Sequence, residues 1–438
     1  MRSLPEWLAF IERQHPKAIA LGLERVREVL GRLRIAPACP VLIIGGTNGK
    51  GSTCAMLESI LRCAGYRTGL YTSPHLVRYN ERVRIDAREA SDESLAEAFV
   101  AVEQARGDTP LTYFEYGTLA AAWLFAREAL DVWVLEVGLG GRLDAVNAFD
   151  PDCAVLTSID MDHMEYLGPT REHIGREKAG IFRADRPAVV ADAKPPQSVF
   201  DAATATGARL LLGGRDFGFV AAPEQWVYWG PQGKRPALAY PALRGPIQLV
   251  NAAASITALD TLRDRLPVAM QDIRRGLAEV EVAGRFQVLP GRPSVILDVA
   301  HNPQAARNLA ANLADSGFAP ETHAVFGALR DKDIAGIVRA LSGRITRWHL
   351  ATLSGPRGTS AADLAAILAS EGVKAPFDLH ESPPQAFEQA RKQAGEADKI
   401  VVFGSFLTVA EVMQSAAVHR AARPAVHPTM PQATPGNR

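Results

Sequence analysis

The sequence has few cysteines and no segment suited to a membrane or to export. Its four cysteines are Cys39, Cys54, Cys63 and Cys153, and no two of them have the C-x-x-C spacing of a zinc site or redox motif. Scattered thiols in a long chain are typical of a reducing compartment. No run of about eighteen apolar residues is present, and the first residues carry charges too early for a signal peptide. We therefore expect a cytoplasmic protein without membrane contact.

The sequence also lacks net charge. Lys plus Arg and Asp plus Glu are equal, at 48 each. Nucleic-acid binders usually carry a basic excess or a basic stripe, so this balance argues against that class. Hydrophobic residues make up 47% and charged residues 22%, which excludes a predominantly disordered chain. We find neither an internal repeat nor coiled-coil heptads, and we expect a monomer.

What the sequence does contain is an alternation of short apolar strands with helices. At about 150 residues per domain, the chain is long enough for two or three domains. In its first part, apolar runs predict strands at 41–44, 132–137 and 153–157, and helices at 52–64, 91–106 and 119–129. This alternation favours an α/β fold whose mostly parallel sheet is covered by helices on both faces.

The composition changes after residue 212 and indicates how the domains are arranged. Glycine, proline and aromatic residues mix over 213–246, where we expect short antiparallel strands, and a helix is predicted at 251–266. A second alternating set has strands at 295–299, 322–326, 347–351 and 399–403. We therefore expect an N-terminal domain over 1–284, a Gly- and Pro-rich linker over 285–293, a second α/β domain over 294–420 and a disordered tail over 421–438.

The sharpest local signal is GGTNGKGST, residues 45–53, between a predicted strand and a predicted helix. Glycines let backbone N–H groups turn toward phosphate oxygens, and the helix N-terminus adds partial positive charge. Lys50 is placed to reach the β- and γ-phosphates, and Ser52 or Thr53 to face the phosphates or a metal. An isoleucine replaces the first glycine of the usual phosphate-loop pattern, and an extra glycine follows the lysine. An ordinary glycine turn is the competing interpretation.

A second signal is LEVGLGGRLDAVN, residues 135–147. Glu136 ends an apolar strand, where a carboxylate is placed to hold Mg²⁺ beside a nucleotide. The glycines that follow allow the backbone to pass close to a ligand. Asp144 and Asn147 are either ligand contacts or only turn and cap residues. This segment predicts a metal-binding strand end.

Two further segments place polar side chains after strands. His163 follows the third predicted strand, and Lys178 lies in the helix beyond that strand. Taken alone, a histidine after a strand more often has a structural role, and a lysine in a helix is usually exposed to solvent. In LDVAHNPQA, Asp298, His301 and Asn302 lie at the end of a strand of the second domain, where α/β sheets expose ligand groups. Asn302 is equally typical of a helix cap, since a proline follows it. One such strand end in each domain suggests a cleft between the domains.

Together these segments resemble the bifunctional dihydrofolate synthase/folylpolyglutamate synthase family, within the larger group of Mur-type ATP-dependent amide ligases. The resemblance runs in order from about residue 21 to residue 412. It is carried by LGLERV, GTNGKGS, TSPHL, TYFEYGT, EVGLGGRLDAVN, DH with YLGPT, REKAGIF, the Asn of VNAAAS, GRFQ, DVAHNPQ and GSF. The added glycine in GKGS looks more like the folate branch than the cell-wall branch. The resemblance implies an N-terminal P-loop ATPase-type parallel-sheet domain and a smaller C-terminal Rossmann-like α/β domain.

The family implies roles for the positions that match its motifs. The positions implied to bind ATP are Asn48, Gly49, Lys50, Gly51, Ser52, Asn251, Arg285 and Asp298. Those implied to hold Mg²⁺ are Ser73, Glu136 and His163, and those implied to act in catalysis are Lys50, His163 and Lys178, the last matching a lysine that family members carry as a carbamate. The positions implied to bind the pterin substrate are Thr112, Tyr113, Phe114, Glu115, Leu143, Asp144 and Ala145. His301 and Ser405 match the glutamate side.

The resemblance implies that L-glutamate is added to 7,8-dihydropteroate and to reduced folates. ATP would convert the acceptor carboxylate to an acyl phosphate, which the glutamate amine then attacks. Two anions meet in the first step, so Mg²⁺ and Lys50 must neutralise charge. Closure of the second domain would keep the acyl phosphate from water, with Arg285 completing the nucleotide site on closure. The expected partners are small molecules only, without nucleic acid or membrane.

Three rival functions remain open. They are a sister ligase that only extends folate tails, a ligase acting on a cell-wall nucleotide peptide, and a nucleotide-binding switch without ligase activity. One departure from the family pattern bears on the first of these. Ala20 stands where some bifunctional members have an acidic residue just before LGLE, so part of the dihydropteroate contact would fall to backbone groups.

Overall fold

The computed structural model describes residues 2–17 and 19–415 and divides into two compact units. The first unit comprises Met1–Phe286 with Asn302–Asp315, and the second comprises Gln287–His301 with Ser316–Arg438. The tail expected over 421–438 lies outside the described residues. Within the described part of the chain, no helix combines the length and the apolar character that crossing a membrane requires.

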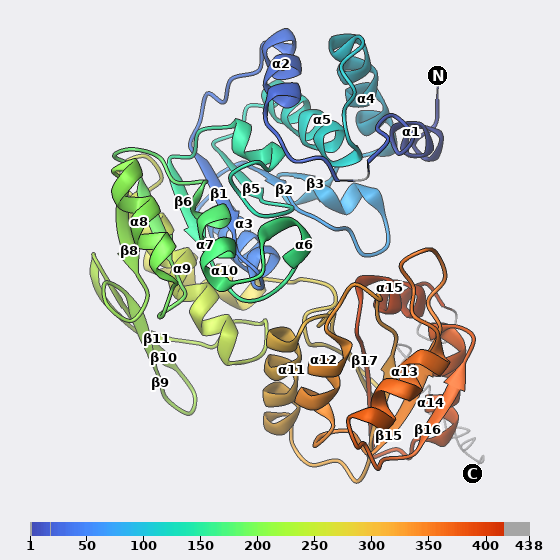
Figure 1. Ribbon diagram of the computed structural model, residues 1–438. Coiled ribbons are helices and arrows are strands. Elements are labelled where there is room, and N and C mark those ends of the chain that lie inside the picture. The colour runs from blue at the N-terminus through green and yellow to red at the C-terminus, as the bar shows by residue number, and fades with distance from the viewer. Residues whose placement is uncertain (1, 18, 416–438) are drawn as a thin grey trace, which may run out of the picture. The chain divides into compact units, whose positions relative to one another are not determined.

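An eight-stranded sheet forms the centre of the first unit (Figure 1). Its strands are β1 (Val41–Gly45), β2 (Thr68–Tyr71), β3 (Val83–Ile85), β4 (Arg88–Glu89), β5 (Val132–Glu136), β6 (Cys153–Leu156), β7 (Pro187–Val190) and β8 (Arg209–Leu212). Their order is β4-β3-β2-β5-β1-β6-β7-β8. The strands from β2 to β8 in this order are parallel, whereas β3 and β4 are antiparallel to their neighbours. The glycine-rich loop therefore follows a strand in the middle of the sheet.

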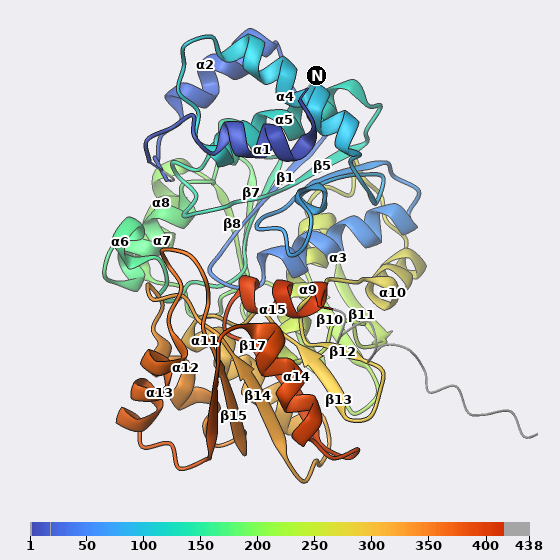
Figure 2. The ribbon, with the colours of Figure 1, turned by 90° about the vertical axis from the view of Figure 1, so that its right-hand side faces the viewer.

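Helices cover both faces of this sheet (Figure 2). The helices of the first unit are α1 (Leu4–Ile11), α2 (Glu24–Leu33), α3 (Lys50–Cys63), α4 (Asp92–Arg106), α5 (Tyr113–Arg127), α6 (Met164–Leu167), α7 (Arg171–Ala179), α8 (Gln197–Thr206), α9 (Pro246–Thr261), α10 (Met270–Glu279) and α11 (Pro303–Asp315), with the 3₁₀ helices η1 (Tyr79–Arg82) and η2 (Ala145–Ala148). α3, α9 and α10 share a core with one face, and α1, α4 and α5 share a core with the other.

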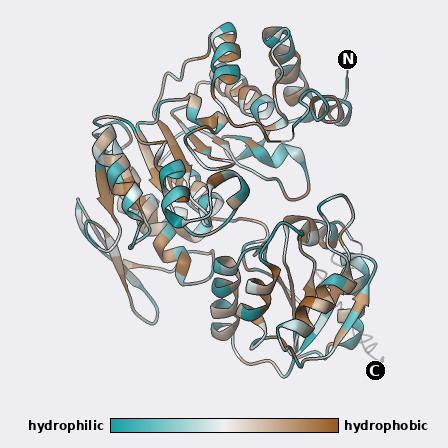
Figure 3. Ribbon diagram, in the orientation of Figure 1, coloured by the Kyte–Doolittle hydropathy of each residue, from teal (hydrophilic) through white to brown (hydrophobic). Residues whose placement is uncertain are grey.

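Alternate residues of the central strands separate these two cores. Ile43 and Leu135 pack on the side of α4 and α5, while Ile44 and Val134 pack on the side of α3 and α9. Successive side chains of a strand point to opposite faces, so a strand buried on both faces is apolar throughout. The central strands of the first unit are accordingly mostly brown in Figure 3. This confirms the predicted parallel sheet with helices on both faces.

The segment 213–246 forms the expected short antiparallel strands. They are β9 (Gly218–Ala221), β10 (Trp226–Gly230) and β11 (Gly233–Leu238) in a separate three-stranded sheet. Arg235 and Tyr228 attach this sheet to α9. The Arg235 guanidinium forms an ion pair with Asp260 at 2.5 Å, and the Tyr228 hydroxyl donates to the same carboxylate at 3.1 Å.

Two helices begin earlier than predicted. The helix predicted at 119–129 is α5, which begins at Tyr113 because Thr112 and Glu115 form a capping box. The helix predicted at 251–266 is α9, which begins at Pro246, where a missing backbone N–H is no loss. In both cases a start signal upstream of the predicted start sets the boundary. The first shift matters for function, since it places residues 112–115 at a helix N-terminus.

The second unit contains a six-stranded sheet of order β12-β13-β17-β14-β15-β16. Its strands are β12 (Gln287–Leu289), β13 (Ser294–Leu297), β14 (Thr322–Phe326), β15 (Arg347–Ala351), β16 (Phe377–His380) and β17 (Lys399–Phe403), and its helices are α12 (Ile334–Leu341), α13 (Ala361–Ser370), α14 (Pro383–Gln393) and α15 (Phe406–Gln414). All its strands are parallel except β12. The rings of Phe326, Trp348 and Phe403 meet in its core. The predicted linker over 285–293 contains β12.

Candidate functional site

The loop between β1 and α3 holds Lys50 against its own backbone. The Lys50 ammonium group donates to the carbonyl oxygens of Gly46 and Thr47 at 3.0 and 3.2 Å. Ser52 and Thr53 follow in the first turn of the helix, and both are buried. The Thr53 hydroxyl has no hydrogen-bond partner within the described part of the chain. The loop thus combines a cation, a helix N-terminus and a hydroxyl, the groups that phosphate binding uses.

Two glycines of this loop are packed too closely for any side chain. Gly46 has φ +142°, and a Cβ there would lie 1.9 Å from Oγ1 of Thr157. Gly49 has φ +94°, and a Cβ there would lie 2.7 Å from Oδ1 of Asn251. The side chains of Thr157 and Asn251 therefore occupy the space that a Cβ on these glycines would need. The same packing brings Asn251 of α9, predicted to contact the nucleotide, directly against the loop.

Asn48 is held by side chains from several elements. Its backbone N–H donates to Oγ of Ser158 at 3.0 Å, and its side chain exchanges hydrogen bonds with Asn302 at 3.0 and 3.1 Å. The Asn48 amide also donates to Gln304, while Asn302 donates to Asp162 at 3.1 Å. Asn302 in addition accepts a backbone N–H at the start of α11, as the helix-cap interpretation predicts, and its role toward a ligand stays a prediction. Ser158 and Gln304 were not predicted, although Gln304 ends the DVAHNPQ motif.

Glu136 is a buried carboxylate beside the glycine-rich loop. It ends β5, is only 4% exposed, and accepts the backbone N–H of Ser73 at 3.1 Å. A Cβ on Gly51 would lie 3.8 Å from both carboxylate oxygens and from Nη2 of Arg285. Burial raises the pKa of Glu136, and the charge of Lys50 acts in the opposite direction. A buried carboxylate of this kind is stabilised by a cation, and its oxygens suit Mg²⁺.

The other two predicted magnesium ligands lie in the loops after β2 and β6. Ser73 precedes a cis peptide bond to Pro74, and its backbone contacts Glu136. His163 begins α6 with φ +51°, and its Nε2 lies 3.9 Å from Oδ2 of Asp162. The sequence did not single out Asp162, whose only signal is its place beside His163. The carboxyl ends of parallel strands meet at one edge of a sheet, which is where all these groups are found.

Lys178 is buried, contrary to the usual solvated position of a helical lysine. It lies on α7 and is 4% exposed. Burial and, next, the charge of Lys50 lower the pKa of Lys178 to about 7, while Asp162 and Asp144 act in the opposite direction. A lysine with such a pKa is a free amine for much of the time at neutral pH. The environment therefore suits a lysine that reacts as a nucleophile.

The segment around Asp144 is a structural turn. Asp144 is buried and accepts two backbone N–H groups, at 2.8 and 3.0 Å, and burial raises its pKa to about 7. Asn147 donates to two backbone carbonyls at 3.0 Å each. Of the two interpretations left open by the sequence, the structure supports turn and cap roles. Leu143 accepts the N–H of Gly22 at 3.2 Å, and Ala145 begins η2, so the turn is docked against the LGLERV segment.

Thr112 and Glu115 position the N-terminus of α5. The Thr112 hydroxyl accepts the Glu115 N–H at 3.3 Å, and Glu115 accepts the Thr112 N–H at 2.7 Å. Arg25 forms an ion pair with Glu115 at 2.7 Å and donates to the backbone carbonyl of Ala20 at 2.6 Å. The backbone at Ala20 is therefore fixed by Arg25. The LGLERV motif was recognisable from the sequence, but Arg25 received no role, because its partner lies 90 residues away.

Tyr113 and Phe114 form an aromatic wall next to the strand end. A Cβ on Gly138, two residues beyond Glu136, would lie 2.6 Å from the Phe114 ring. The Tyr113 ring lies 5.5 Å from the guanidinium of Arg82. Flat aromatic faces of this kind suit a planar heterocycle such as a pterin. The predicted pterin residues and the phosphate loop therefore lie at the same edge of the sheet.

In the second unit, three predicted residues share the carboxyl edge of neighbouring strands. Asp298 and His301 follow β13, Ser405 follows β17, and these strands are parallel neighbours. Asp298 accepts a backbone N–H at 2.8 Å. The His301 ring lies 5.8 Å from that of Phe406. Ser405 is buried and caps α15 by accepting the N–H of Thr408 at 3.0 Å.

Comparison with protein families matches two domains in this chain. Residues 44–214 match the Mur ligase middle domain, and residues 284–406 match the Mur ligase, glutamate ligase domain. The dihydrofolate synthase/folylpolyglutamate synthase of Escherichia coli (strain K12) is 45% identical over 94% of this chain and 95% of its own length. The corresponding protein of Haemophilus influenzae is 40% identical over 93% of this chain and 96% of its own.

Solved structures show the same similarity in three dimensions. E. coli FolC in complex with DHPP and ADP superposes with a TM-score of 0.91 at 44% identity, over 96% of this chain and 99% of that one. A bifunctional folylpolyglutamate synthase/dihydrofolate synthase with Mn, AMPPNP and L-glutamate bound has a TM-score of 0.88 at 45% identity, over 96% of this chain and 98% of that one. These neighbours confirm the predicted two-part α/β fold.

Proposed function

The chain belongs to the dihydrofolate synthase/folylpolyglutamate synthase family of Mur ligases, and from that premise we propose that it joins L-glutamate to 7,8-dihydropteroate and to reduced folates with ATP as co-substrate. One observation carries the proposal. The glycine-rich loop after β1, the buried carboxylate of Glu136 after β5 and the aromatic start of α5 lie at one edge of one sheet. Phosphate, cation and pterin sites are needed together for this reaction.

The glycine-rich loop is the proposed phosphate site. Asn48, Gly49, Lys50, Gly51 and Ser52 would bind the phosphates of ATP through backbone N–H groups, the ammonium and a hydroxyl. Lys50 would exchange its hydrogen bonds to loop carbonyls for bonds to phosphate oxygens. The close packing of two loop glycines supports this assignment, because it holds the loop backbone in place against Thr157 and Asn251.

The residues at the strand ends fit Mg²⁺. Burial raises the pKa of the Glu136 carboxylate, while the charges of Lys50 and Arg285 act in the opposite direction. The buried Thr53 hydroxyl is without a hydrogen bond within the described residues. Ser73, Glu136 and His163 would hold the ion, which when bound neutralises phosphate charge during phosphoryl transfer. Arg285, whose guanidinium lies beside Gly51 and Glu136, is proposed to add a second positive charge toward the nucleotide.

The reaction would proceed in two steps. A carboxylate oxygen of the acceptor attacks the γ-phosphorus, the bond to the β–γ bridging oxygen breaks, and ADP leaves with an acyl phosphate formed. The neutral amine of glutamate then attacks the acyl carbon, the C–O bond to phosphate breaks, and the nitrogen loses a proton as the amide forms. Lys50 would stabilise negative charge on the transferred phosphoryl group throughout.

The remaining predicted residues have supporting rather than reacting roles. Tyr113 and Phe114 would pack on the pterin ring, while Thr112 and Glu115 hold the helix that carries them. Lys178 is proposed to act as a carbamate anion, because its neutral amine is able to add CO₂ and the product offers two oxygens to a cation. For Asn251, Leu143, Asp144, Ala145, Asp298, His301 and Ser405, the roles implied by the family stay predictions.

A paired assay tests the proposal. The purified full-length chain is given ATP, Mg²⁺ and L-glutamate with either 7,8-dihydropteroate or tetrahydrofolate, and both phosphate release and product mass are followed. We expect one phosphate per amide formed with each acceptor. Activity with tetrahydrofolate alone would reduce the proposal to a folate-tail ligase.

Two controls distinguish a ligase from a nucleotide-binding switch. Omission of glutamate should stop product formation, and Lys50→Met should stop phosphate release while leaving the fold intact. ATP binding without glutamate-dependent phosphate release would identify a nucleotide switch and overturn the proposal. Absence of phosphate release with every acceptor would overturn it as well.

A further inference from the structure

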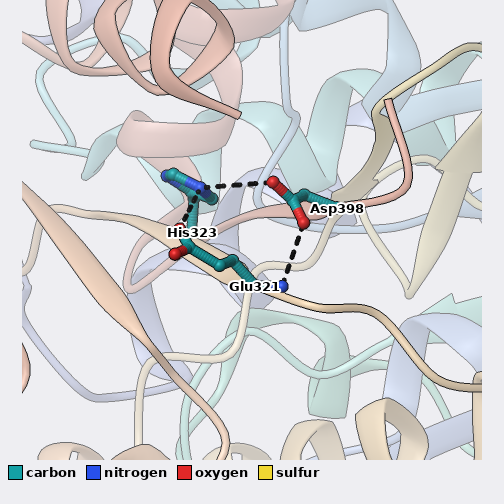
Figure 4. A group of neighbouring side chains, drawn as sticks. All are labelled: Glu321, His323 and Asp398. Atoms are coloured by element: carbon teal, nitrogen blue, oxygen red, sulfur yellow. Dashed lines mark hydrogen bonds and ion pairs between the residues drawn. The ribbon is translucent and has the colours of Figure 1, made fainter. Parts of the chain in front are cut away.

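The second unit contains a group of titratable side chains that the proposed reaction does not use (Figure 4). His323 lies on β14, Glu321 directly precedes β14, and Asp398 directly precedes β17. Nε2 of His323 lies 3.2 Å from Oε2 of Glu321 and 3.9 Å from Oδ2 of Asp398. One ligand atom from each residue lies within 4.8 Å of the others. This group is at the amino edge of the sheet, opposite the edge that carries Asp298 and Ser405.

The imidazole of His323 faces two carboxylates, both within ion-pair distance of its Nε2. The residue is fully buried, and its Nε2 has no hydrogen-bond partner within the described part of the chain, although Glu321 is close. Asp398 is fixed in place, since it accepts the backbone N–H groups of Glu321 at 3.0 Å and Gly395 at 2.7 Å. The Glu321 side chain is 53% exposed, whereas the side chains of His323 and Asp398 are 1% and 10% exposed. Two of the three ligand groups are therefore held in place inside the unit, and Glu321 faces solvent.

A row of histidines continues from His323 across the neighbouring strands. Nδ1 of His323 lies 3.2 Å from Nε2 of His349 on β15, and Nδ1 of His349 lies 3.9 Å from a carboxylate oxygen of Asp378 on β16. His349 is also fully buried, and its Nδ1 has no hydrogen-bond partner within the described residues. The ring of His380 stacks on the far side at 5.6 Å. The imidazole nitrogens of His323 and His349 thus connect the carboxylates of Glu321 and Asp398 to the carboxylate of Asp378.

Counting protons along this row leaves two arrangements of the N–H groups. Each neutral imidazole carries one N–H, so both N–H groups point either toward Glu321 or toward Asp378. In the first case, a buried lone pair of His349 faces Asp378. In the second, the lone pair of His323 Nε2 faces Glu321 and Asp398, which is unfavourable unless a cation lies between them.

We propose that Glu321, His323 and Asp398 bind a divalent transition-metal cation, specifically Zn²⁺, with His349 and Asp378 orienting the ligand imidazole. Ligand atoms 3.2 and 3.9 Å apart suit metal–ligand bonds of about 2.0–2.2 Å in a tetrahedral arrangement. An imidazole nitrogen favours zinc, since Mg²⁺ and Ca²⁺ prefer oxygen ligands alone. Metal-binding histidines usually donate their other N–H to a fixed acceptor, the role that His349 would take.

The bound cation would join the loops that lead into two adjacent strands. Glu321 and Asp398 precede β14 and β17, which pair in parallel from Thr322 and Lys399 onward. A cation shared by these loops would stabilise the start of both strands. The site therefore has a structural role in the second unit and is separate from the magnesium site proposed for ATP.

Zinc binding by the full-length chain tests this inference. Metal-free protein in millimolar Mg²⁺ is titrated with Zn²⁺ by calorimetry, and thermal unfolding is measured with and without Zn²⁺. Glu321→Gln removes one exposed ligand charge without disturbing the fold, and Glu388→Gln on α14 makes the same change at an exposed position outside the group. We expect Glu321→Gln to weaken one zinc site at least about tenfold and to remove the thermal stabilisation. Glu388→Gln should change neither.

Two further variants make the outcome unambiguous. His323→Gln should lose the same equivalent of bound zinc, and circular dichroism checks that this variant folds. Glu136→Gln should keep that equivalent, because Glu136 belongs to the proposed ATP-side site and its replacement removes only zinc bound at that site. Equal zinc stoichiometry and affinity in wild type, Glu321→Gln and His323→Gln would overturn the proposal. So would a wild type whose zinc binding disappears entirely in Glu136→Gln.

Discussion

Replacement of Lys178 by methionine should abolish ligase activity and at the same time stabilise the fold. Methionine keeps most of the volume of the buried side chain but has no amine. The wild-type lysine is unfavourable in its position, because burial and the charge of Lys50 lower its pKa from 10.5 to about 7. A group kept in an unfavourable state is expected where function requires it.

The magnitude follows from linkage. Between pH 7 and 10.5 the unfolded chain binds a proton at Lys178 that the folded chain has released, so the free energy of unfolding rises with pH. From pKa values of 10.5 and about 7, this group destabilises the fold at pH 7 by about 4 kcal/mol, and by almost nothing above pH 10.5. The same shift raises the free-amine fraction at pH 7 from about 0.03% to about one half, a gain on the order of 10³ in the form that adds CO₂.

The assay compares wild type and Lys178→Met in urea at several pH values from 7 to 10, in buffers free of CO₂. The variant should be more stable by about 4 kcal/mol at pH 7, with the difference disappearing toward pH 10.5. Its phosphate release should fall by about 10²-fold or more. In wild type, ¹³C-labelled bicarbonate should produce a carbamate signal that the variant lacks.

The exposed Lys194 provides the matched control, since Lys194→Met removes an ammonium group from solvent. It should leave activity, the carbamate signal and the pH dependence of unfolding unchanged. Full activity in Lys178→Met would refute the catalytic assignment. A pH-independent stability difference between wild type and Lys178→Met would refute the account of its pKa.

Two other substitutions test the phosphate loop and the cation site. Gly49→Ala should weaken ADP binding by more than tenfold and should destabilise the fold, because its Cβ would meet Asn251. The destabilisation should exceed the roughly 1–2 kcal/mol that a positive φ costs. Gly65→Ala has a similar φ and open space around it, so it should show only this backbone cost. Calorimetry with ADP and urea unfolding measure both, and equal effects of the two substitutions would contradict the packing argument. Glu136→Gln should make ADP affinity insensitive to Mg²⁺. The control Glu128→Gln, at an exposed position, should keep the wild-type magnesium dependence of ADP affinity. If Glu136→Gln also kept this dependence, Glu136 would not belong to the cation site.

Local sequence patterns predicted those parts of the protein whose signal is local. Strands at 322–326, 347–351 and 399–403 were predicted to the residue, since each is a short apolar run with clear ends. The glycine-rich loop was recognisable because glycine is required where a backbone packs against another element, as at Gly46. The starts of α5 and α9 were misplaced, although a capping box marks the first and a proline at the first helical position marks the second.

By itself the sequence determined the α/β class, the two sets of strands and the phosphate loop, all of which follow from periodicity and turn chemistry within a few residues. Only the tertiary structure decided that Lys178 is buried near Asp162, that Arg25 holds Glu115, and that histidines on three strands form one row. Strand order brings such residues together, and strand order depends on the packing of the whole sheet. No local sequence pattern shows which distant charged residue will lie beside a buried side chain. That neighbouring charge helps to set the pKa, and so the reactivity, of the buried group.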